Sequence, residues 1–481
     1  MSEITSIAVT TALLGPDYDS SGPVELVLQD GLIAAIRPWA GAAPRLLAMP
    51  AVTDAHNHAR PLSSASFGAA LKPLELWLPQ LATMPAVDPY TAAAAAFARS
   101  LRGGATAVMV HLTRAMGQRP LPQEAREIAR AAQDVGISIG FAVAMRDRNP
   151  LVYGDHASVL SRLGPDAAQM VHKTWGAAPL AVADQIALVD EVAAAVADMT
   201  VHVDVQYGPT GVQWCSMDLL AAIADASDRT GRRVHMHLLE TRPQRDWADR
   251  SYPDGIVAML DRIGLLSPRL TLAHCVYGRA AEYAAIARAG TRIAVNVSSN
   301  LHLSSGIASV TAMQAAGVQV AMGLDGCALD DDDDALRELR LFHFLNRAPG
   351  FGTDGMTPQT ALKAACATGR AGLGLPPGGV LAPGMPADLL LLDLDLLDPD
   401  ALMPVDPRDF VMTRATRNMI RRIYAGGRLV LSDVRPTGVD IDRLHTNLRT
   451  QVRAGLPGTA ALATLWPEIE DAIAAEYRGC C

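Results

Sequence analysis

The sequence predicts an α/β fold: a (β/α)8, TIM-like barrel with a satellite β-sandwich built from both chain ends. From residue 51 onward, eight apolar runs alternate with amphipathic, alanine-rich segments, a pattern typical of βα units and a parallel sheet. Eight such units favour a closed barrel over an open, doubly wound sheet. Short β-branched segments lie before residue 50 and return after residue 376, so both chain ends are expected to contribute to the sandwich.

Each candidate barrel strand is a short apolar run followed by a helical stretch. The candidate strands are Met49–Thr53, Ala105–Val110, Ser138–Ala142, Thr200–Gln206, Arg233–Leu238, Leu270–His274, Arg292–Val295 and Gln319–Gly323. The candidate helices are Tyr90–Arg102, Pro122–Val135, Ala181–Ala197, Ser216–Thr230, Gly255–Ile263, Arg279–Ala289, Val310–Ala316 and Asp334–Leu345. The barrel would occupy residues 51–375, which exceeds the usual ~250 residues, so long loops are expected.

The two ends of the chain are expected to form one sandwich from residues 1–50 and 376–435. Glu25–Gln29 alternates apolar and polar side chains and runs into a hairpin turn signal. Leu389–Asp393 is an apolar strand that brings β structure back after the barrel. Residues 436–481 are predicted to form a peripheral helical extension.

The composition is that of an ordinary globular protein and argues against a nucleic-acid-binding or membrane-spanning protein. Half of the 481 residues are hydrophobic and 19% are charged. The net charge of −9 disfavours a nucleic-acid partner, because phosphate binding needs a basic surface. No apolar run reaches the roughly 18 residues of a membrane span. Six cysteines without a C-x-x-C pair, and an N-terminus without a signal-peptide pattern, favour a reducing cytoplasm.

Two histidines follow the first predicted barrel strand. Residues two apart in a strand face the same way, so His56 and His58 are expected to point together into the barrel mouth. Two imidazoles on one face suit a divalent metal such as zinc. A pair of hydrogen-bonded polar residues at a strand end is the alternative.

A second cluster lies at the end of the strand Arg233–Leu238. His237 is expected to supply a third imidazole, whereas His235 should lie one layer deeper in the core. Glu240 can reach the same cavity but does not share the strand face of His237. This placement fits a proton shuttle better than a metal ligand; a carboxylate in the first turn of a helix is the alternative.

Two further polar residues end apolar strands. His274 closes Leu270–His274, and Asp325 follows Gln319–Gly323. The carboxylate of Asp325 can complete a metal shell and accept a proton from bound water. All these positions fall at C-terminal strand ends, the face on which barrel active sites are built. We therefore predict one metal-centred hydrolytic site there.

Several short motifs follow one another in a fixed order over almost the whole chain. They are Ala51–His58, Gly103–Ala107, Tyr207–Ser216, His237–Thr241, Ala273–Cys275, Ser299–Ala308, Gly323–Gly326 and Gly384–Asp388. In order and spacing they resemble the motifs of the amidohydrolase superfamily, and within it the cytosine deaminase-like and chlorohydrolase-like (ATZ/TRZ) aminohydrolases. The resemblance implies a mononuclear site with one Zn²⁺, or alternatively Fe²⁺, per subunit. It implies these roles: metal ligands His56, His58, His237 and Asp325, a contact of His274 with the metal-bound water, and proton shuttling by Glu240.

The chain departs from the family pattern around the expected substrate cavity. Thr210 replaces a histidine that relatives use for substrate contact, and Leu329-Asp330-Asp331 replaces a common Ser-Asn-Asn segment. No metal ligand is lost, but the resemblance does not define the substrate. Lys173 lies in a predicted loop between the third and fourth strands, so we interpret it as a surface lysine and not as a carbamylated bridging ligand.

Four residues are candidates for substrate contact: Trp77, Trp214, Asn300 and Asp330. Trp214 would stack on a flat heterocycle, and a core position is the alternative. The acidic run from Asp330 to Asp334 is more often a solvated loop than a site, although it would favour amino-rich substrates if it faced the cavity.

The expected reaction is hydrolytic deamination of an amino-substituted N-heterocycle: a pyrimidine, purine, pterin or s-triazine. Metal-bound hydroxide would attack a ring carbon, Asp325 would take the water proton, and Glu240 would protonate the ring nitrogen before ammonia leaves. Hydrolysis of an amide, urea, carbamate or chloro group is the alternative, and a non-catalytic binding protein ranks last because no ligand is missing. By analogy we expect a small-molecule substrate, a homo-oligomer, and no nucleic-acid or membrane partner.

Overall fold

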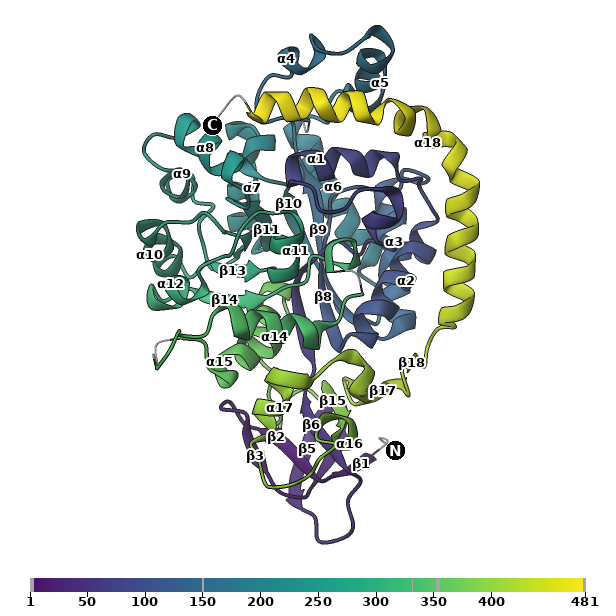
Figure 1. The fold of residues 1–481 in the computed structure, drawn as a ribbon, viewed down its shortest axis with the longest axis vertical. Coiled ribbons are helices and arrows are strands. Elements are labelled where there is room, and N and C mark those ends of the chain that lie inside the picture. Colours follow the sequence, from purple (N-terminus) through teal and green to yellow (C-terminus); the bar gives the residue numbers. More distant parts are fainter. Residues whose placement is uncertain (1–3, 149–150, 331, 352–354, 479–481) are drawn as a thin grey trace.

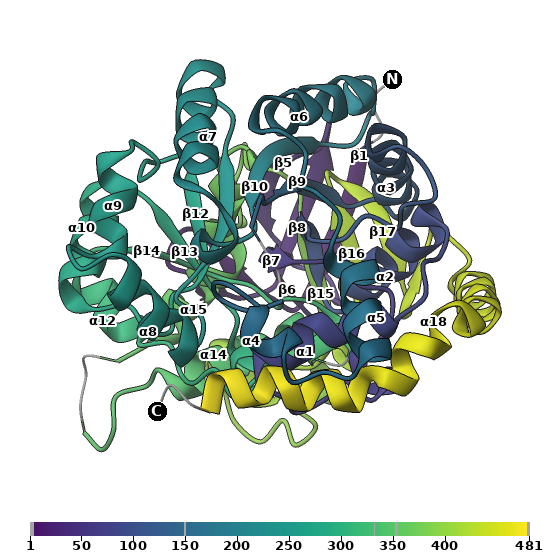
Figure 2. The same ribbon diagram turned by 90° about the horizontal axis from the view of Figure 1, so that it is seen from above.

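The centre of the molecule is an eight-stranded parallel barrel whose strands follow one another in sequence order (Figure 2). The structure is a computed structural model that describes residues 4–148, 151–330, 332–351 and 355–478. The barrel strands are β7 (Val52–Asn57), β8 (Ala105–Leu112), β9 (Ser138–Met145), β10 (Val203–Pro209), β11 (Val234–Leu238), β12 (Leu270–His274), β13 (Arg292–Val295) and β14 (Gln319–Met322). The N–H groups of Leu324 and Asp325 donate to the carbonyl of His56 over 3.2 and 2.7 Å, so the last strand meets the first and the barrel is nearly closed. The predicted α/β barrel is confirmed.

The predicted strand positions hold except at β10, which lies at Val203–Pro209 and not at Thr200–Gln206, and at the start of the barrel. The segment predicted as one strand, Met49–Thr53, belongs to two: β6 (Leu46–Pro50) in another sheet and β7 in the barrel. The N–H of Ala51 between them donates to the carbonyl of Asp388 at 3.0 Å, which fixes the point where the chain crosses over. A continuous apolar run cannot reveal such a crossing, because both strands are buried.

Helices cover the outside of the barrel (Figure 1). They are α2 (Pro89–Arg102), α3 (Leu121–Val135), α6 (Val182–Val196), α7 (Met217–Thr230), α8 (Arg242–Ser251), α9 (Ile256–Arg262), α10 (Ala280–Arg288), α12 (Val310–Ala315), α14 (Ala335–Leu345) and α15 (Pro358–Leu362). Two short helices, α11 (Val297–His302) and α13 (Cys327–Asp330), follow β13 and β14 at the carboxyl ends of these strands. Alanine in α2 allows close packing, and Gly103 ends it where a Cβ would lie only 1.6 Å from the carbonyl oxygen of Asp333. After α15 the chain continues in a wider and then a tighter helical turn, η4 (Lys363–Ala367) and η5 (Thr368–Leu373).

Two more sheets pack together at the end of the molecule that holds the N-terminus (Figure 1). One has the order β1 (Ile4–Val9), β4 (Val24–Gln29), β5 (Leu32–Pro38). The other has the order β18 (Arg435–Pro436), β17 (Arg428–Ser432), β16 (Ile420–Ala425), β15 (Leu389–Asp393), β6, β2 (Thr11–Leu14), β3 (Asp19–Ser21). Short helices α16 (Leu394–Leu397) and α17 (Pro407–Arg414) lie beside the second sheet. Side chains such as Leu26, Ile33 and Leu391 form an apolar cluster that both sheets share.

The chain ends in the 38-residue helix α18 (Ile441–Arg478). It runs along α2 and then crosses over α1 (Leu74–Gln80), α4 (Ala157–Leu160) and α5 (Pro165–Trp175), as Figures 1 and 2 show. Its last turns bury Trp466 and Ile473 against Leu151 and other side chains of the segment between β9 and β10. No helix in the described part of the chain combines the length and apolarity of a membrane span.

Candidate metal centre and active-site cavity

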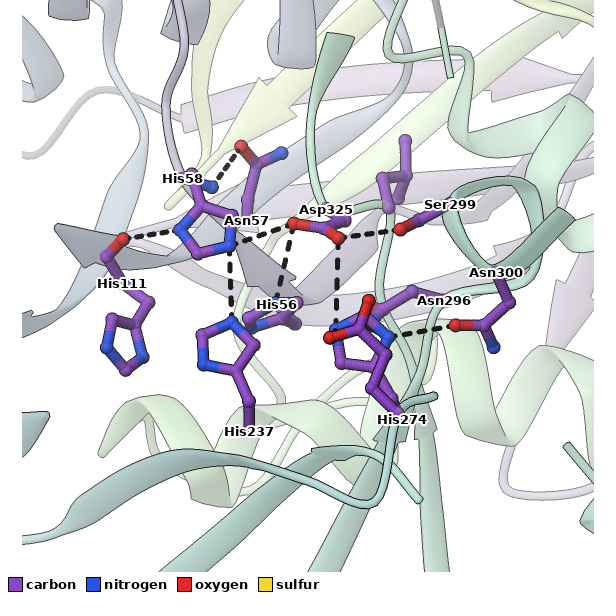
Figure 3. Close-up of polar contacts among 12 residues, drawn as sticks. His56, Asn57, His58, His111, His237, His274, Asn296, Ser299, Asn300 and Asp325 are labelled. Atoms are coloured by element: carbon purple, nitrogen blue, oxygen red, sulfur yellow. Dashed lines mark hydrogen bonds and ion pairs between the residues drawn. The ribbon is translucent and has the colours of Figure 1, made fainter. Parts of the chain in front are cut away.

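Side chains from three separate parts of the chain meet where β7, β11 and β14 end (Figure 3). The Nε2 atoms of His58 and His237 lie 3.3 Å apart. Asp325 Oδ1 lies 2.9 Å from His58 Nε2 and 3.5 Å from His56 Nε2. Candidate ligand atoms of His56, His58 and His237 all lie within 4.8 Å of one another, as do those of His56, His274 and Asp325. The structure therefore brings together the four residues predicted as metal ligands.

Hydrogen bonds orient two of the imidazoles. His58 Nδ1 lies 2.6 Å from the carbonyl oxygen of His111, and His237 Nδ1 lies 2.8 Å from that of Thr210. A carbonyl only accepts, so each Nδ1 must carry the proton and each Nε2 presents a lone pair to the centre. Histidine ligands of metals are typically held in this way.

The ring of His56 is fully buried, and neither nitrogen has a hydrogen-bond partner among the described residues. It stacks on the ring of His235, with centroids 4.9 Å apart and planes 2° from parallel. Buried polar groups are nearly always hydrogen-bonded or bound to a ligand. The orphaned imidazole of His56 is therefore an observation in favour of a metal at this point.

Charge at the centre matches a divalent cation. Burial lowers the pKa of His56 and His237 well below the usual histidine value and also lowers that of His58, so the imidazoles are neutral. The pKa of Asp325 lies well below its usual range despite burial, so its carboxylate is ionised beside these rings. Three neutral imidazoles and one carboxylate form a donor set that suits Zn²⁺.

His274 and Glu240 flank the carboxylate of Asp325. His274 Nε2 lies 3.7 Å from Glu240 Oε2 and 3.8 Å from Asp325 Oδ2. Its Nδ1 lies 2.9 Å from Asn300 Oδ1, which can only accept, so the Nδ1 carries a proton. Burial raises the pKa of Glu240 well above its usual value, and the carboxylates of Asp325 and Glu75 raise it further. A buried carboxyl group with a raised pKa can both take and give a proton near neutral pH.

The strand ends turn sharply through left-handed backbone conformations at non-glycine residues. Positive φ angles occur at Ala59 (50°), Leu239 (51°), His274 (71°) and Asp325 (63°). Such conformations cost roughly 1–3 kcal/mol each and cluster at functional sites. Here they turn the chain directly beside the residues that meet in the cavity.

Sequence reasoning missed several residues of this centre. His111 is the penultimate residue of β8, its carbonyl oxygen orients His58, and its ring lies 4.7 Å from that of His237. Its position at a C-terminal strand end, like that of His274, is a signal that could have identified it. The hydroxyl of Ser299 donates to Asp325 Oδ2 at 2.7 Å, and no pattern in the sequence predicted this contact.

A cavity of about 360 Å³ opens from this centre. Trp77 and Trp214 both line it, together with Arg60 and with Val452 of helix α18. The indole N–H of Trp77 donates to Ser64 at 2.9 Å, and the guanidinium of Arg60 lies 4.9 Å from the Trp77 ring and 3.8 Å from Asp325 Oδ1. The cavity walls thus combine flat apolar rings with charged groups near the metal centre.

The other two candidates for substrate contact are not among the cavity-lining residues. Asn300 lies behind His274 and orients it through the contact described above. Asp330 is buried; its Oδ1 accepts from the N–H of Asp333 at 2.8 Å, and its carboxylate lies 3.8 Å from Arg337.

The acidic run is not a solvated loop over its described residues. Asp333 accepts from the hydroxyl of Ser100 at 3.1 Å, and Asp334 accepts from the N–H groups of Arg337 and Arg417 at 3.1 Å. The acidic run therefore connects α2, α14 and the segment before β16. Asp331 lies outside the described residues. Lys173 was expected in a loop but lies exposed on α5, between β9 and β10.

Comparison with known proteins agrees with the motifs. The model of the amidohydrolase family matches residues 47–430, and the chain belongs to this family. The 5′-deoxyadenosine deaminase of Methanosarcina barkeri (strain Fusaro / DSM 804) is 29% identical over 240 residues, which are 50% of this chain and 55% of that protein. The 8-oxoguanine deaminase of Pseudomonas aeruginosa PAO1 is 32% identical over 241 residues, 50% of this chain and 53% of the relative. The chain thus spans about half the length of these curated relatives.

Solved structures show the same fold over nearly the whole chain. An adenosine deaminase from Xanthomonas campestris with bound zinc superposes with a TM-score of 0.79 at 23% identity, covering 94% of this chain and 98% of that one. Atrazine chlorohydrolase TrzN from Arthrobacter aurescens TC1, complexed with zinc, gives 0.74 at 20% identity, with 93% and 100% covered.

Proposed function

We propose that this protein is a metal-dependent hydrolytic deaminase of an amino-substituted N-heterocycle, either a pyrimidine, a purine, a pterin or an s-triazine. The observation that carries the proposal is the convergence of His56, His58, His237 and Asp325 beside the buried Glu240. Relatives named as deaminases of 5′-deoxyadenosine and of 8-oxoguanine support this choice of substrate class.

His56, His58, His237 and Asp325 would hold one Zn²⁺ per subunit, with Fe²⁺ as the alternative. Zinc in two solved structures of this fold supports the first choice. Such a metal supplies Lewis-acid activation of water at neutral pH. The buried, neutral imidazoles and the ionised carboxylate fit this role without further protonation changes.

The protein groups around the metal divide the proton transfers between them. Asp325 accepts the proton of the attacking water, and His274 orients that water and stabilises the charge on its oxygen. Glu240 delivers a proton to the ring nitrogen next to the carbon under attack. Glu240 then takes up the remaining hydroxyl proton as the carbonyl forms, and the proton held by Asp325 passes to the amino group, which leaves as ammonia. The 3.7 Å separation of Glu240 Oε2 and His274 Nε2 supports a role for both groups at the same substrate.

Of the four candidates for substrate binding, Trp77 and Trp214 are proposed to contact the substrate directly, whereas Asn300 and Asp330 lie outside the cavity lining. The two tryptophans would stack face-to-face or edge-to-face on a flat ring, because both line the cavity. Asn300 would act through His274. Asp330 is the weakest member of the set, since its carboxylate is engaged with Asp333 and Arg337.

We also propose a division into a β-sandwich (1–50 and 376–435), a metal-binding barrel (51–375) and a C-terminal helical extension (436–481), which the sheet order and α18 support. We propose a homo-oligomer that acts on small molecules and has no nucleic-acid or membrane partner. The net charge of −9 supports the absence of a nucleic-acid partner. The buried free thiols of Cys215, Cys275 and Cys366 support a reducing compartment such as the cytoplasm.

The test is ammonia release by the zinc-loaded protein from a panel of aminopyrimidines, aminopurines, aminopterins and amino-s-triazines. The Asp325→Asn variant serves as the control that lacks the ionised carboxylate. Zinc-dependent ammonia release in the wild type, absent from the variant, is the expected result. Release of chloride, or hydrolysis of an amide, urea or carbamate without any heterocycle deamination, would replace this proposal by the alternative hydrolase activity.

A further inference from the structure

A buried network of polar side chains lies beneath the Glu240 loop. The carboxylate of Glu75, on α1, accepts a hydrogen bond from the hydroxyl of Tyr153 at 2.8 Å and another from the hydroxyl of Thr241. Gln244 donates through Nε2 to the Tyr153 hydroxyl at 3.3 Å. Through Oε1 it accepts the backbone N–H of Glu240 at 2.8 Å. One tyrosine hydroxyl thus joins both supports of the loop that carries Glu240.

Tyr153 comes from the segment between β9 and β10, and helix α18 holds it in place. The backbone N–H of Tyr153 donates to the hydroxyl of Tyr477 at 3.2 Å, and the two rings lie 5.4 Å apart at 68°. Beside them, Leu151 and Val171 pack against Trp466 and Ile473 of α18. The contact chain therefore runs from the C-terminal helix to the backbone of Glu240.

The loop is also tied at its two ends, where the N–H of Tyr277 donates to the carbonyl of Leu239 at 3.0 Å and the N–H of Arg245 donates to that of Thr241 at 3.1 Å. Leu239, immediately before Glu240, has a left-handed backbone with φ of 51°. Glu240 Oε1 is buried without a hydrogen-bond partner among the described residues, so its position depends on the backbone and on Oε2. Misplacement of a reacting group by about 1 Å can cost roughly 100-fold in rate.

We propose that Tyr153 is a positioning residue for Glu240: its hydroxyl bridges Glu75 and Gln244, and helix α18 fixes Tyr153 through Tyr477. The proposal rests on the proposed function, because it assigns this network a role in the proton transfer of Glu240. It gives the C-terminal helix a task in catalysis although the helix supplies no group that reacts. Neither Tyr153 nor Tyr477 is expected to touch the reacting atoms.

The experiment compares Tyr153→Phe with the matched control Tyr90→Phe. Tyr90 also donates its hydroxyl to a carboxylate, Asp134, at 2.7 Å, but on the outside of the barrel between α2 and α3. Hydrogen–deuterium exchange of the peptide covering residues 239–244 reports on the loop without any turnover. Steady-state kinetics on whichever substrate the zinc-loaded wild type hydrolyses reports on catalysis, and metal analysis reports on the centre.

For Tyr153→Phe we expect faster exchange in the 239–244 peptide and a fall in kcat of about tenfold or more. KM and zinc content should stay within about twofold of wild type. Tyr477→Phe should shift exchange and kcat in the same direction, and Tyr90→Phe should change neither. If Tyr153 acts through Gln244, its substitution in a Gln244→Ala background should add little, whereas independent effects would multiply.

Unchanged exchange in Tyr153→Phe overturns the proposal whatever the activity, and so does faster exchange with a wild-type kcat. Multiplicative effects of Tyr153→Phe and Gln244→Ala overturn the route through Gln244. A wild type that releases no ammonia from any heterocycle counts against the proposed function. In that case the exchange data, and kcat on any other hydrolysed substrate, still decide the role of Tyr153.

Discussion

Replacing Glu240 by glutamine separates proton transfer from metal binding. Glutamine has the same size and shape, keeps the backbone N–H bond to Gln244, and leaves the four proposed ligands untouched. It cannot give or take the proton. General acid–base groups contribute about 10²–10⁴ in rate, and a buried carboxyl group with a raised pKa is well suited to this task. We therefore expect kcat/KM to fall by about 10³, which is about 4 kcal/mol of transition-state stabilisation.

The same substitution should not destabilise the metal-free fold. Burial raises the pKa of Glu240 above the value of an unfolded chain, so the folded state holds a proton that the unfolded state loses above about pH 4.5. A carboxyl group of this kind lowers stability as pH rises toward its folded pKa. Glutamine has no proton to lose, so the free energy of unfolding at pH 7 should be unchanged or higher.

The assay combines ammonia release, zinc per chain by atomic emission, and thermal unfolding with and without chelator. Glu191→Gln, an exposed position on α6, is the control for a carboxylate lost elsewhere. A near-normal kcat in Glu240→Gln would refute the shuttle role. Loss of zinc from this variant would refute the claim that Glu240 transfers protons without binding the metal.

Three further outcomes are expected. His237→Ala should lower zinc affinity by at least about 100-fold, and equilibrium dialysis measures it; full retention of zinc would exclude His237 as a ligand. Asp334→Ala should cost about 1–2 kcal/mol, measured by urea unfolding, with unchanged zinc content, because its carboxylate caps α14. Burial raises the pKa of Glu338 from 4.5 to about 7, so unfolding free energy should fall by up to about 3 kcal/mol as pH rises from 4.5 to 7. Glu338→Gln should flatten this profile, and an unaltered pH dependence would contradict the assignment.

Much of the barrel could be predicted because its signals are local. Apolar runs of strand length and intervening helical stretches report directly on burial and periodicity, and six of the eight strands lie where these signals place them, whereas β10 begins three residues later than predicted. The start of the first strand could not be placed, since residues 46–52, which span β6 and the first residue of β7, form one uninterrupted apolar run. Only the pairing of β6 with β15 separates them.

The candidate site, like the barrel, could be predicted only in part from the sequence. The spacing of His56 and His58 defines a shared strand face, and strand-end positions point to His237, His274 and Asp325. Those rules assign a residue to an end of the sheet but not to a contact. They missed His111, and they could not show that Asn300 orients His274 or that Asp333 and Asp334 lie buried against α2 and α14.

What the sequence determined by itself is the order of buried and exposed segments, and with it the class of fold and the set of histidines and carboxylates at one barrel face. What only the tertiary structure decided is which atoms meet there. It decided the tautomers of His58 and His237 and the left-handed turns beside the candidate site residues. It also decided the link from Tyr477 through Tyr153 and Gln244 to Glu240, which joins residues hundreds of positions apart. Burial can be predicted from the pattern of apolar residues that are neighbours along the chain. The hydrogen bonds at this centre depend instead on where distant segments of the chain lie in space.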